Sequence, residues 1–191
     1  MSDKRSPSAA PGSAYEISTK REQKRTHILA VIVDNEPGVL ARVIGLFSGR
    51  GYNIEGLTVS AVNDEHTVSR ITIHTSGSKM VIEQIKAQLA RMVPVHDVHD
   101  LTVEGKLVQR EIALVKVRAR NTKRRESLRL ANVFEATVVD TTLESFIFQL
   151  AGSPARIDAF AQLMQALGEC EIVRSGIIAV SRGGTVLRLQ A

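Results

Sequence analysis

The residues best suited to bind a small molecule lie in a short loop at positions 35–40, which reads Asn-Glu-Pro-Gly-Val-Leu. Residues with helical apolar spacing follow it, so the loop is predicted to begin a helix. The first amides of a helix lack intrahelical acceptors and carry partial positive charge, which suits a carboxylate. Pro37 has no N–H, so the amides of Gly38, Val39 and Leu40 are the candidate donors. Gly38 also lets a ligand approach the backbone closely.

Nearby side chains extend this candidate site. Asn35 offers an amide group, and Asn53 offers a second one near the predicted start of the next strand. Val39, Leu40 and Ile54 can enclose a small apolar group. A ligand with a carboxylate, an amine and an aliphatic group is an amino acid. An ordinary helix cap and turn explains the same residues without a ligand, so the residues alone leave both interpretations open.

A second candidate is the basic segment 116–129, which holds seven Lys and Arg residues against one Glu. Lys116, Arg118 and Arg120 alternate along a predicted strand and therefore project from one face. The strand runs into further cations at a predicted helix start, where positive charge opposes the helix dipole. The segment is either a solvated charged face or a docking surface for an acidic partner or an anionic ligand.

No catalytic pattern accompanies these residues. The chain has no Gly-x-Ser-x-Gly elbow, Walker loop or Gly-x-Gly-x-x-Gly, and its carboxylates form no defensible acid–base pair. Cys170 has glutamates on both sides, which are expected to raise the pKa of the thiol and lower its reactivity. His96 and His99 lie three residues apart on a predicted strand, so their rings diverge and cannot chelate one ion. The sequence therefore predicts no catalytic residues and no metal site.

The elements that position these residues follow the order βαββαβ in the first part of the chain. Strands are predicted at 27–33, 52–62, 67–75 and 95–103, with helices between the first two and between the last two. Asp34 or Asn35 is expected to cap the first helix, with Pro37 at its first position. Gly51 is expected to end that helix in a left-handed conformation.

The same order recurs in the rest of the chain. Strands are predicted at 111–120, 136–140, 143–150 and 171–180, with helices at 122–134 and after Gly152-Ser153-Pro154. The chain is therefore α+β, with two ferredoxin-like βαββαβ modules. The expected divisions are a disordered basic tail (1–25), a first domain (26–104), a second domain (108–183) and a short tail (184–191).

Charge is distributed unevenly over the 191 residues, whose net charge is +5. Residues 1–25 carry a net +3 and residues 116–129 carry +6, so the remainder is mildly acidic. RNA-recognition modules share the order βαββαβ but stack bases on aromatic residues of the third strand. The predicted third strand of the first module has none, and core packing explains Phe146 and Phe148 in the second. Nucleic acid is therefore not an expected partner.

Two other features bear on location. No uncharged apolar run approaches the length needed to span a membrane. The single cysteine permits no internal disulfide and points to a reducing compartment. A cytoplasmic protein with no membrane partner is expected.

Five short motifs, taken in order, resemble a known family. They are Asn35-Glu36-x-Gly38-x-Leu40-x-Arg42-Val43, Leu46-Phe47-x-x-Arg50-Gly51-Tyr52-Asn53-Ile54, Arg110-Glu111-Ile112-x-Leu114-Val115-Lys116-Val117, Ile157-Asp158-Ala159-Phe160 and Arg174-Ser175-Gly176. Residues 26–103 resemble an ACT domain, a βαββαβ module that senses small molecules. The chain from 26 to 183 resembles the regulatory (small) subunit of acetolactate synthase, also called acetohydroxyacid synthase.

The resemblance implies a subunit without a catalytic centre or a bound cofactor. Such subunits bind a large subunit that uses thiamine diphosphate, Mg²⁺ and FAD to condense pyruvate with pyruvate or 2-oxobutyrate. They raise its activity and confer feedback inhibition by branched-chain amino acids, usually valine. Their ACT domains pair as homodimers, with the effector at the interface.

Carried over by motif, the implied effector-site residues are Asn35, Gly38, Val39, Leu40, Asn53 and Ile54. Lys116, Arg118 and Arg120 stay a hypothesis for partner docking. A stand-alone amino-acid-sensing ACT protein that regulates a different enzyme is the alternative function.

Overall fold

The computed structural model describes residues 24–184, 186 and 187. The N-terminal module consists of β1 (Arg25–Asp34), α1 (Val39–Ser48), β2 (Gly56–Ala61), β3 (Val68–Gly77), α2 (Lys79–Leu89) and β4 (Val95–Asp100). The C-terminal module consists of β5 (Leu107–Arg118), α3 (Asn121–Val133), β6 (Thr137–Thr141), β7 (Ser145–Gly152), α4 (Pro154–Leu167), β8 (Glu169–Arg174) and β9 (Ile178–Ser181). The expected tails lie almost entirely outside the described residues.

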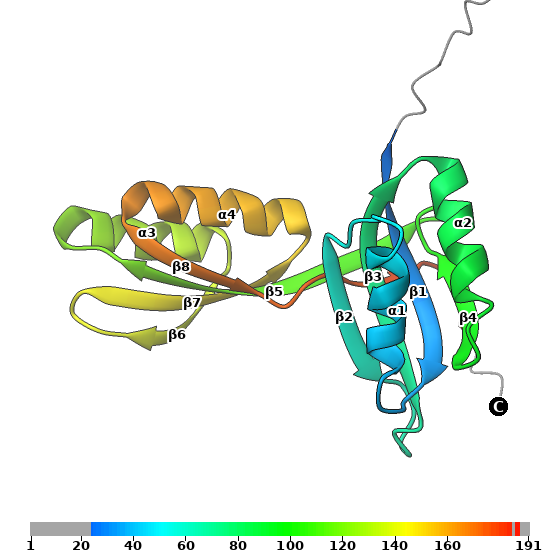
Figure 1. Ribbon diagram of the computed structural model, residues 1–191. Coiled ribbons are helices and arrows are strands. Elements are labelled where there is room, and N and C mark those ends of the chain that lie inside the picture. The colour runs from blue at the N-terminus through cyan, green and yellow to red at the C-terminus, as the bar shows by residue number, and fades with distance from the viewer. Residues whose placement is uncertain (1–23, 185, 188–191) are drawn as a thin grey trace, which may run out of the picture.

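The N-terminal module is an antiparallel sheet in the order β2-β3-β1-β4, with α1 and α2 on one face (Figure 1). β1 is central and its apolar run is buried on both faces, as an uninterrupted apolar stretch predicts. Its odd-numbered residues meet the buried stripe of each helix. The core on this side is Leu29, Val31, Val33, Val39, Val43, Phe47, Ile71, Ile73, Ile82, Ile85 and Leu89.

The C-terminal module repeats this plan with the strand order β6-β7-β5-β8. Buried and exposed residues alternate along the second half of β5, and the buried ones pack under α3 and α4. Phe146 and Phe148 lie in this core, which accounts for them as packing residues. Ser153 caps α4 and Ser78 caps α2, each accepting a hydrogen bond from the amide three residues on. The two α+β modules confirm the predicted fold class.

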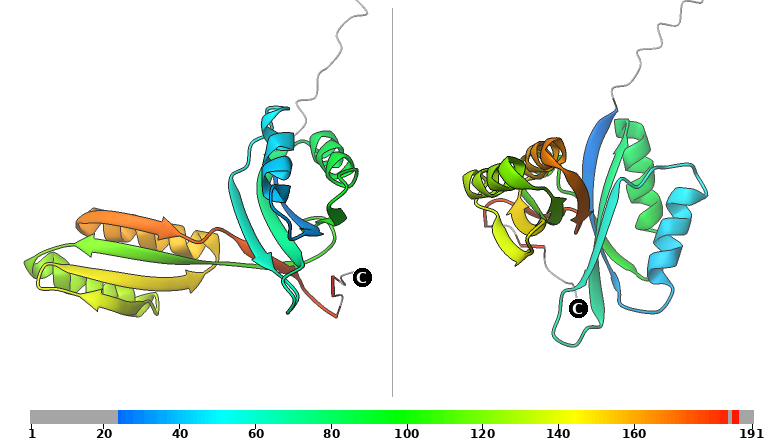
Figure 2. Two further views of the ribbon diagram at one scale, coloured as in Figure 1. Left: turned by 60° about the horizontal axis from the view of Figure 1, so that its bottom comes forward. Right: turned by 90° about the vertical axis from the view of Figure 1, so that its left-hand side faces the viewer.

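β5 runs from the C-terminal sheet to the N-terminal module. Residues 111–118 pair with β7 and β8, whereas residues 107–110 pair only with β9. This short β5–β9 ribbon crosses the face of the N-terminal sheet that the helices leave open (Figure 2). Ile28, Ala30, Leu101 and Ala179 form a small second core there. The N-terminal sheet is therefore covered on both faces.

The structure corrects three local predictions. The closing strand predicted at 171–180 is two strands, β8 and β9, because the chain turns at Gly176 with a φ of 83°. β2 begins at Gly56 and not at residue 52. Leu143, predicted as the start of a strand, lies in the turn between β6 and β7.

Candidate functional site

The start of α1 differs from its predicted form. Its N-cap residue is Gly38, with a φ of 87° and no side-chain cap, so the expected capping by Asp34 or Asn35 is wrong. The left-handed conformation at Gly38 delays the first helical residue to Val39. The Val39 amide donates to the Glu36 carbonyl oxygen at 3.3 Å.

Free donors remain at this helix start. Within the described part of the chain, the amides of Gly38, Leu40 and Ala41 have no backbone acceptor. Two of the three predicted donors are thus available to a carboxylate, and Ala41 adds another. A side chain built on Gly38 would meet no atom within 4 Å, so the space in front of the loop is open.

Asn35 holds this loop in place. Its backbone amide donates to the Thr67 carbonyl oxygen at 2.7 Å, and its side-chain amide donates to the His66 carbonyl oxygen at 2.7 Å. Both contacts tie the loop to the turn between β2 and β3. The side-chain oxygen of Asn35 is the group left to face a ligand.

Val39 and Leu40, two hydrophobic residues of the predicted site, lie on different faces of α1. Val39 is only 3% exposed because it faces the core with Val43 and Phe47. Leu40, one residue on, is on the outer face of α1 and partly exposed. Of these two neighbours, Leu40 alone offers a side chain to the surface, because the Val39 side chain is in the core and its amide is bonded to Glu36.

Asn53 and Ile54 lie at the other end of the sheet. The Asn53 carbonyl oxygen accepts a hydrogen bond from Thr75, whereas Asn35 is bonded to Thr67. Eight residues of extended chain separate Thr67 from Thr75, which is about 26 Å. One copy of the chain therefore brings together Asn35, Gly38 and Leu40, but not Asn53.

The surface between these two groups is apolar. Ile44 follows Leu40 by one turn on the outer face of α1 and is 41% exposed, with Ala41 and Gly45 beside it. Val59, on edge strand β2, faces the same side of the sheet as the helices and is also exposed. An edge strand and an apolar helix face side by side are suited to pairing with another sheet.

Two family models match the chain. Residues 29–97 match a family described as "AHAS small subunit-like ACT domain". Residues 110–183 match "Small subunit of acetolactate synthase". The two matches correspond to the two modules of the structure.

Individual relatives match most of this chain and nearly all of their own length. The "Acetolactate synthase isozyme 3 small subunit" of Salmonella typhimurium is 46% identical over 84% of this chain and 98% of its own. The "Acetolactate synthase small subunit" of Haemophilus influenzae is 47% identical over 82% of this chain and 95% of its own. The crystal structure of the Thermotoga maritima small subunit superposes with a TM-score of 0.75, at 35% identity, covering 84% and 99% of the two chains.

The chain belongs to the small subunits of acetolactate synthase. Membership confirms the predicted family and the prediction of a regulatory, non-catalytic subunit. Among the described residues, no helix has the length and apolar character required to cross a membrane.

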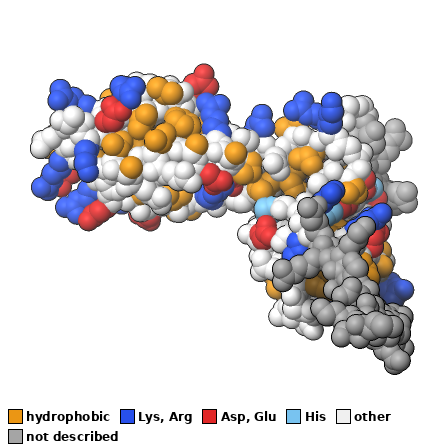
Figure 3. All heavy atoms as spheres, turned by 90° about the horizontal axis from the view of Figure 1, so that it is seen from above, with side chains coloured by type: hydrophobic (Ala, Val, Ile, Leu, Met, Phe, Trp, Pro, Cys, Tyr) orange, Lys and Arg blue, Asp and Glu red, His pale blue; other side chains and the backbone are white. Residues whose placement is uncertain are grey.

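The predicted docking cations of this small subunit lie at the end of the C-terminal module that is remote from the N-terminal one. Figure 3 shows Lys and Arg side chains gathered at that end. Arg120 forms a 2.5 Å ion pair with Glu144, and Arg118 lies 3.7 Å from Glu144 and 3.4 Å from Glu169. Lys116 is 3.8 Å from Glu171. The three cations do project from one face, but each has a carboxylate beside it.

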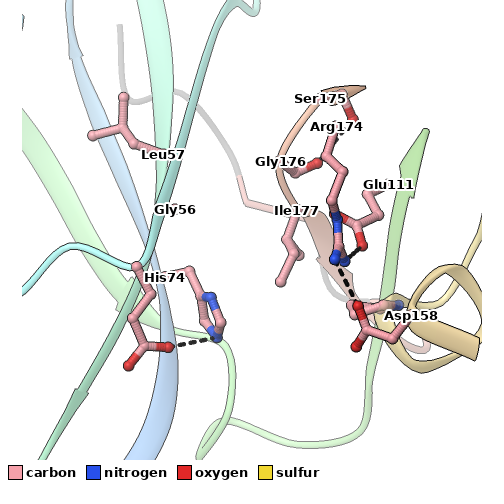
Figure 4. Close-up of a pocket in the computed structure, with 11 residues that line it drawn as sticks. Gly56, Leu57, His74, Glu111, Asp158, Arg174, Ser175, Gly176 and Ile177 are labelled. Atoms are coloured by element: carbon pink, nitrogen blue, oxygen red, sulfur yellow. Dashed lines mark hydrogen bonds and ion pairs between the residues drawn. The ribbon is translucent and has the colours of Figure 1, made fainter. Parts of the chain in front are cut away.

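The small subunit also has a cleft of about 570 Å³ between its modules (Figure 4). Arg174 of β8 lies on one wall, where it pairs with Glu111, which is almost completely buried, and with Asp158 at 2.6 Å. The hydrogen bond to Glu111 contributes most to raising the pKa of Arg174, and the hydrogen bond to Asp158 also raises it. His74 and Glu55 form the opposite wall and lie 3.5 Å apart.

Sequence reasoning did not foresee the contacts at this junction. Thr58 donates to the Ile177 carbonyl oxygen at 3.3 Å, and Arg70 donates to that of Ala179 at 2.6 Å. A Cβ on Gly176 would lie 2.9 Å from the Thr58 methyl group. The sequence shows polar residues at alternate positions of β2 and β3, but it does not show which segment of the chain packs against them. The glycine after Arg174-Ser175 was the one available indication of a turn.

Proposed function

We propose that this chain binds the large, catalytic subunit of acetolactate synthase, raises its activity and makes it sensitive to a branched-chain amino acid, with valine the expected effector. The observation that carries the proposal is the open helix start at Gly38, whose free amides suit a carboxylate. Thiamine diphosphate, Mg²⁺ and FAD are assigned to the large subunit, and no cofactor is assigned to this chain.

The complete effector site is proposed to form between two copies of the chain. The loop at Asn35 lies level with the end of β2, because Ala61 pairs with Ser69 just beyond Thr67. Asn53 precedes the start of the same strand. If two β2 edges pair about a two-fold axis, they run antiparallel, and the start of one lies beside the end of the other.

This homodimer would place the partner's Asn53 and the partner's Ile54 opposite Gly38. The amides of the loop would then hold the effector carboxylate, the two asparagine side chains its ammonium group, and Leu40 with the partner's Ile54 its aliphatic group. The apolar outer face of α1 would supply the buried area that stabilises such a dimer. Effector binding across the interface would favour one arrangement of the dimer, which the large subunit distinguishes.

Two further assignments complete the proposal. We infer that residues 26–104 act as the effector-binding domain and residues 108–183 as a second domain, in line with the spans of the two family matches. A cytoplasmic location is proposed from the single cysteine.

The experiment that tests the function is an assay of acetolactate formation from pyruvate. The large subunit is measured with and without this chain, and the mixture is titrated with valine, leucine and isoleucine. The proposal expects higher activity with the chain and inhibition only in its presence. An unchanged rate, or inhibition of the large subunit alone, would contradict it and favour an ACT protein that regulates another enzyme.

A further inference from the structure

The turn between β6 and β7 displays one leucine at the remote end of the C-terminal module. Leu143 is 93% exposed, although the strand that follows it, β7, buries Phe146, Phe148 and Leu150 in the core. Single exposed leucines are common, so exposure alone carries no meaning. The way in which this turn is held, and the charges around it, distinguish Leu143 from the other exposed apolar residues.

The turn is fixed by hydrogen bonds on both sides of Leu143. The Thr142 hydroxyl oxygen accepts from the amides of Glu144 at 3.2 Å and Ser145 at 3.0 Å. The Thr142 amide donates to the Ser145 carbonyl oxygen at 2.9 Å. A turn fixed in this way loses little conformational entropy when it binds a partner.

Arg124 of α3 clamps the same turn from outside. Its guanidinium donates to the Thr142 carbonyl oxygen at 2.7 Å and to the Thr141 hydroxyl at 3.2 Å. The guanidinium carbon also lies 4.1 Å from the centre of the Phe146 ring, which is part of the core. The position of Leu143 is therefore set by the packed body of the module.

An open hollow of about 580 Å³ lies beside Leu143. Its other walls are Lys116 and Arg118 of β5, Thr142 and Glu144 of the turn, and Ser145 at the start of β7. The cations at this end are Lys116, Arg118, Arg120, Lys123, Arg124 and Arg125, and the carboxylates that pair with them are Glu144, Glu169 and Glu171. The surface keeps net positive charge after this pairing and suits a negatively charged partner.

We propose that this end of the C-terminal module docks on the large catalytic subunit, with Leu143 as its apolar anchor and the hollow receiving an acidic segment that carries an apolar side chain. The inference rests on the proposed function, because it takes the large subunit as the partner, and it deepens the docking role expected for Lys116, Arg118 and Arg120. Charge decides against the same end of a second copy of this chain, because two such ends would bring like charges together.

The test compares variants in their affinity for the large subunit, measured by biolayer interferometry and by titrating acetolactate formation. Leu143→Ser is expected to weaken binding by about 10- to 100-fold, the factor expected from exposing a leucine that is buried in the complex. The loss should persist at high salt, because it is apolar in origin. Val93→Ser is the matched control, since Val93 is 96% exposed in a loop of the N-terminal module and should bind normally.

Two further variants separate the components of the surface. A Lys116→Ala, Arg118→Ala, Arg120→Ala triple variant should lose affinity at low salt and approach the wild type at high salt. Thr142→Ala removes the acceptor for two amides and should weaken binding while Leu143 is still present. Both should keep the wild-type circular dichroism spectrum.

The outcomes distinguish this inference from the proposed function. Normal binding by Leu143→Ser would overturn the anchor, and normal binding by the triple variant would overturn the electrostatic part. An equal loss in Val93→Ser would overturn the specific role of Leu143. Failure of the wild-type chain to raise large-subunit activity would instead overturn the proposed function itself.

Discussion

The guanidinium of Arg70, on β3 of the N-terminal module, donates a hydrogen bond of 2.6 Å to the carbonyl oxygen of Ala179 on β9. Partial burial lowers the pKa of Arg70, but the group stays a cation at neutral pH. Thr58 on β2 makes a second such bond, to the Ile177 carbonyl oxygen. The segment after β8 is thus held by two strands of the N-terminal sheet. Because β2 is also the edge proposed to pair in the dimer, a change there has a direct route to the second module.

The close approach at Gly176 provides the first prediction. Gly176→Ala adds a methyl group 2.9 Å from the Thr58 methyl, at a residue with a φ of 83°. We expect the free energy of unfolding to fall by about 2–4 kcal/mol, from backbone strain and overpacking together. At about 2–4 °C per kcal/mol for a chain of this size, the melting temperature should fall by roughly 4–16 °C.

Matched variants separate the two causes. Gly183→Ala has the same kind of backbone strain, with a φ of 95°, but its Cβ meets no atom within 4 Å. It should therefore show only the strain. Thr58→Ser removes the opposing methyl and keeps the hydroxyl, so it should restore much of the stability of Gly176→Ala. Equal losses for the two alanine variants, with no rescue, would show that the contact with Thr58 is unimportant.

The junction also marks where prediction from the sequence stopped. Most strands and helices followed from apolar periodicity, and the start of α4 followed from the turn residues Gly152-Ser153-Pro154. The division between β8 and β9 did not, because β-prone residues flank Ser175-Gly176 on both sides and a single glycine inside such a run can also mark a bulge. What covers the open face of a sheet depends on chain segments far away in the sequence.

The open helix start provides the second prediction. Gly38→Asp places a carboxylate where the effector carboxylate is proposed to bind. Like charges within a few ångströms repel strongly, so the valine concentration for half-inhibition should rise at least about tenfold. Gly38→Ala is the control, because it adds strain at a φ of 87° without charge and should raise that concentration less. Both variants should still raise large-subunit activity. Unchanged valine sensitivity in Gly38→Asp would contradict the site.

The third prediction concerns the dimer. Ile44→Glu puts a charge in the middle of the apolar outer face of α1, where the residue is already 41% exposed, so the fold should persist. Sedimentation velocity should show a dissociation constant raised at least about tenfold, with valine inhibition lost in parallel. Met80→Glu is the control, because Met80 is 61% exposed on α2, on the other helix. If Ile44→Glu stays dimeric, the pairing surface lies elsewhere.

For the effector site, the sequence predicts which residues bind the ligand but not how they come together in space. Asn35 and Asn53 stand in recognisable motifs, but one chain separates them by the length of a strand. The proposed site needs a second copy, which one sequence does not describe. Val39 shows a smaller limit: it lies one turn before Val43 and two turns before Phe47 on the buried stripe of α1, so its side chain is in the core, and the helix begins at Val39 and not at Pro37. Cap position is the least certain feature of a predicted helix.

The fourth prediction concerns Cys170, whose thiol pKa is raised by partial burial. The sequence predicts the same direction but a different cause: repulsion by the neighbouring carboxylates in place of desolvation. A smaller fraction of the Cys170 thiol is ionised at a given pH, so iodoacetamide should label the folded protein more slowly than the urea-unfolded chain, with the labelling profile shifted to higher pH.

The same shift links stability to pH. The Cys170 thiol of the folded state keeps its proton to a higher pH than that of the unfolded state, so stability should fall as the pH rises above the unfolded pKa of about 8.5. Cys170→Ala should lack this part of the decrease. Equal labelling profiles for the folded and unfolded chains would contradict the raised pKa.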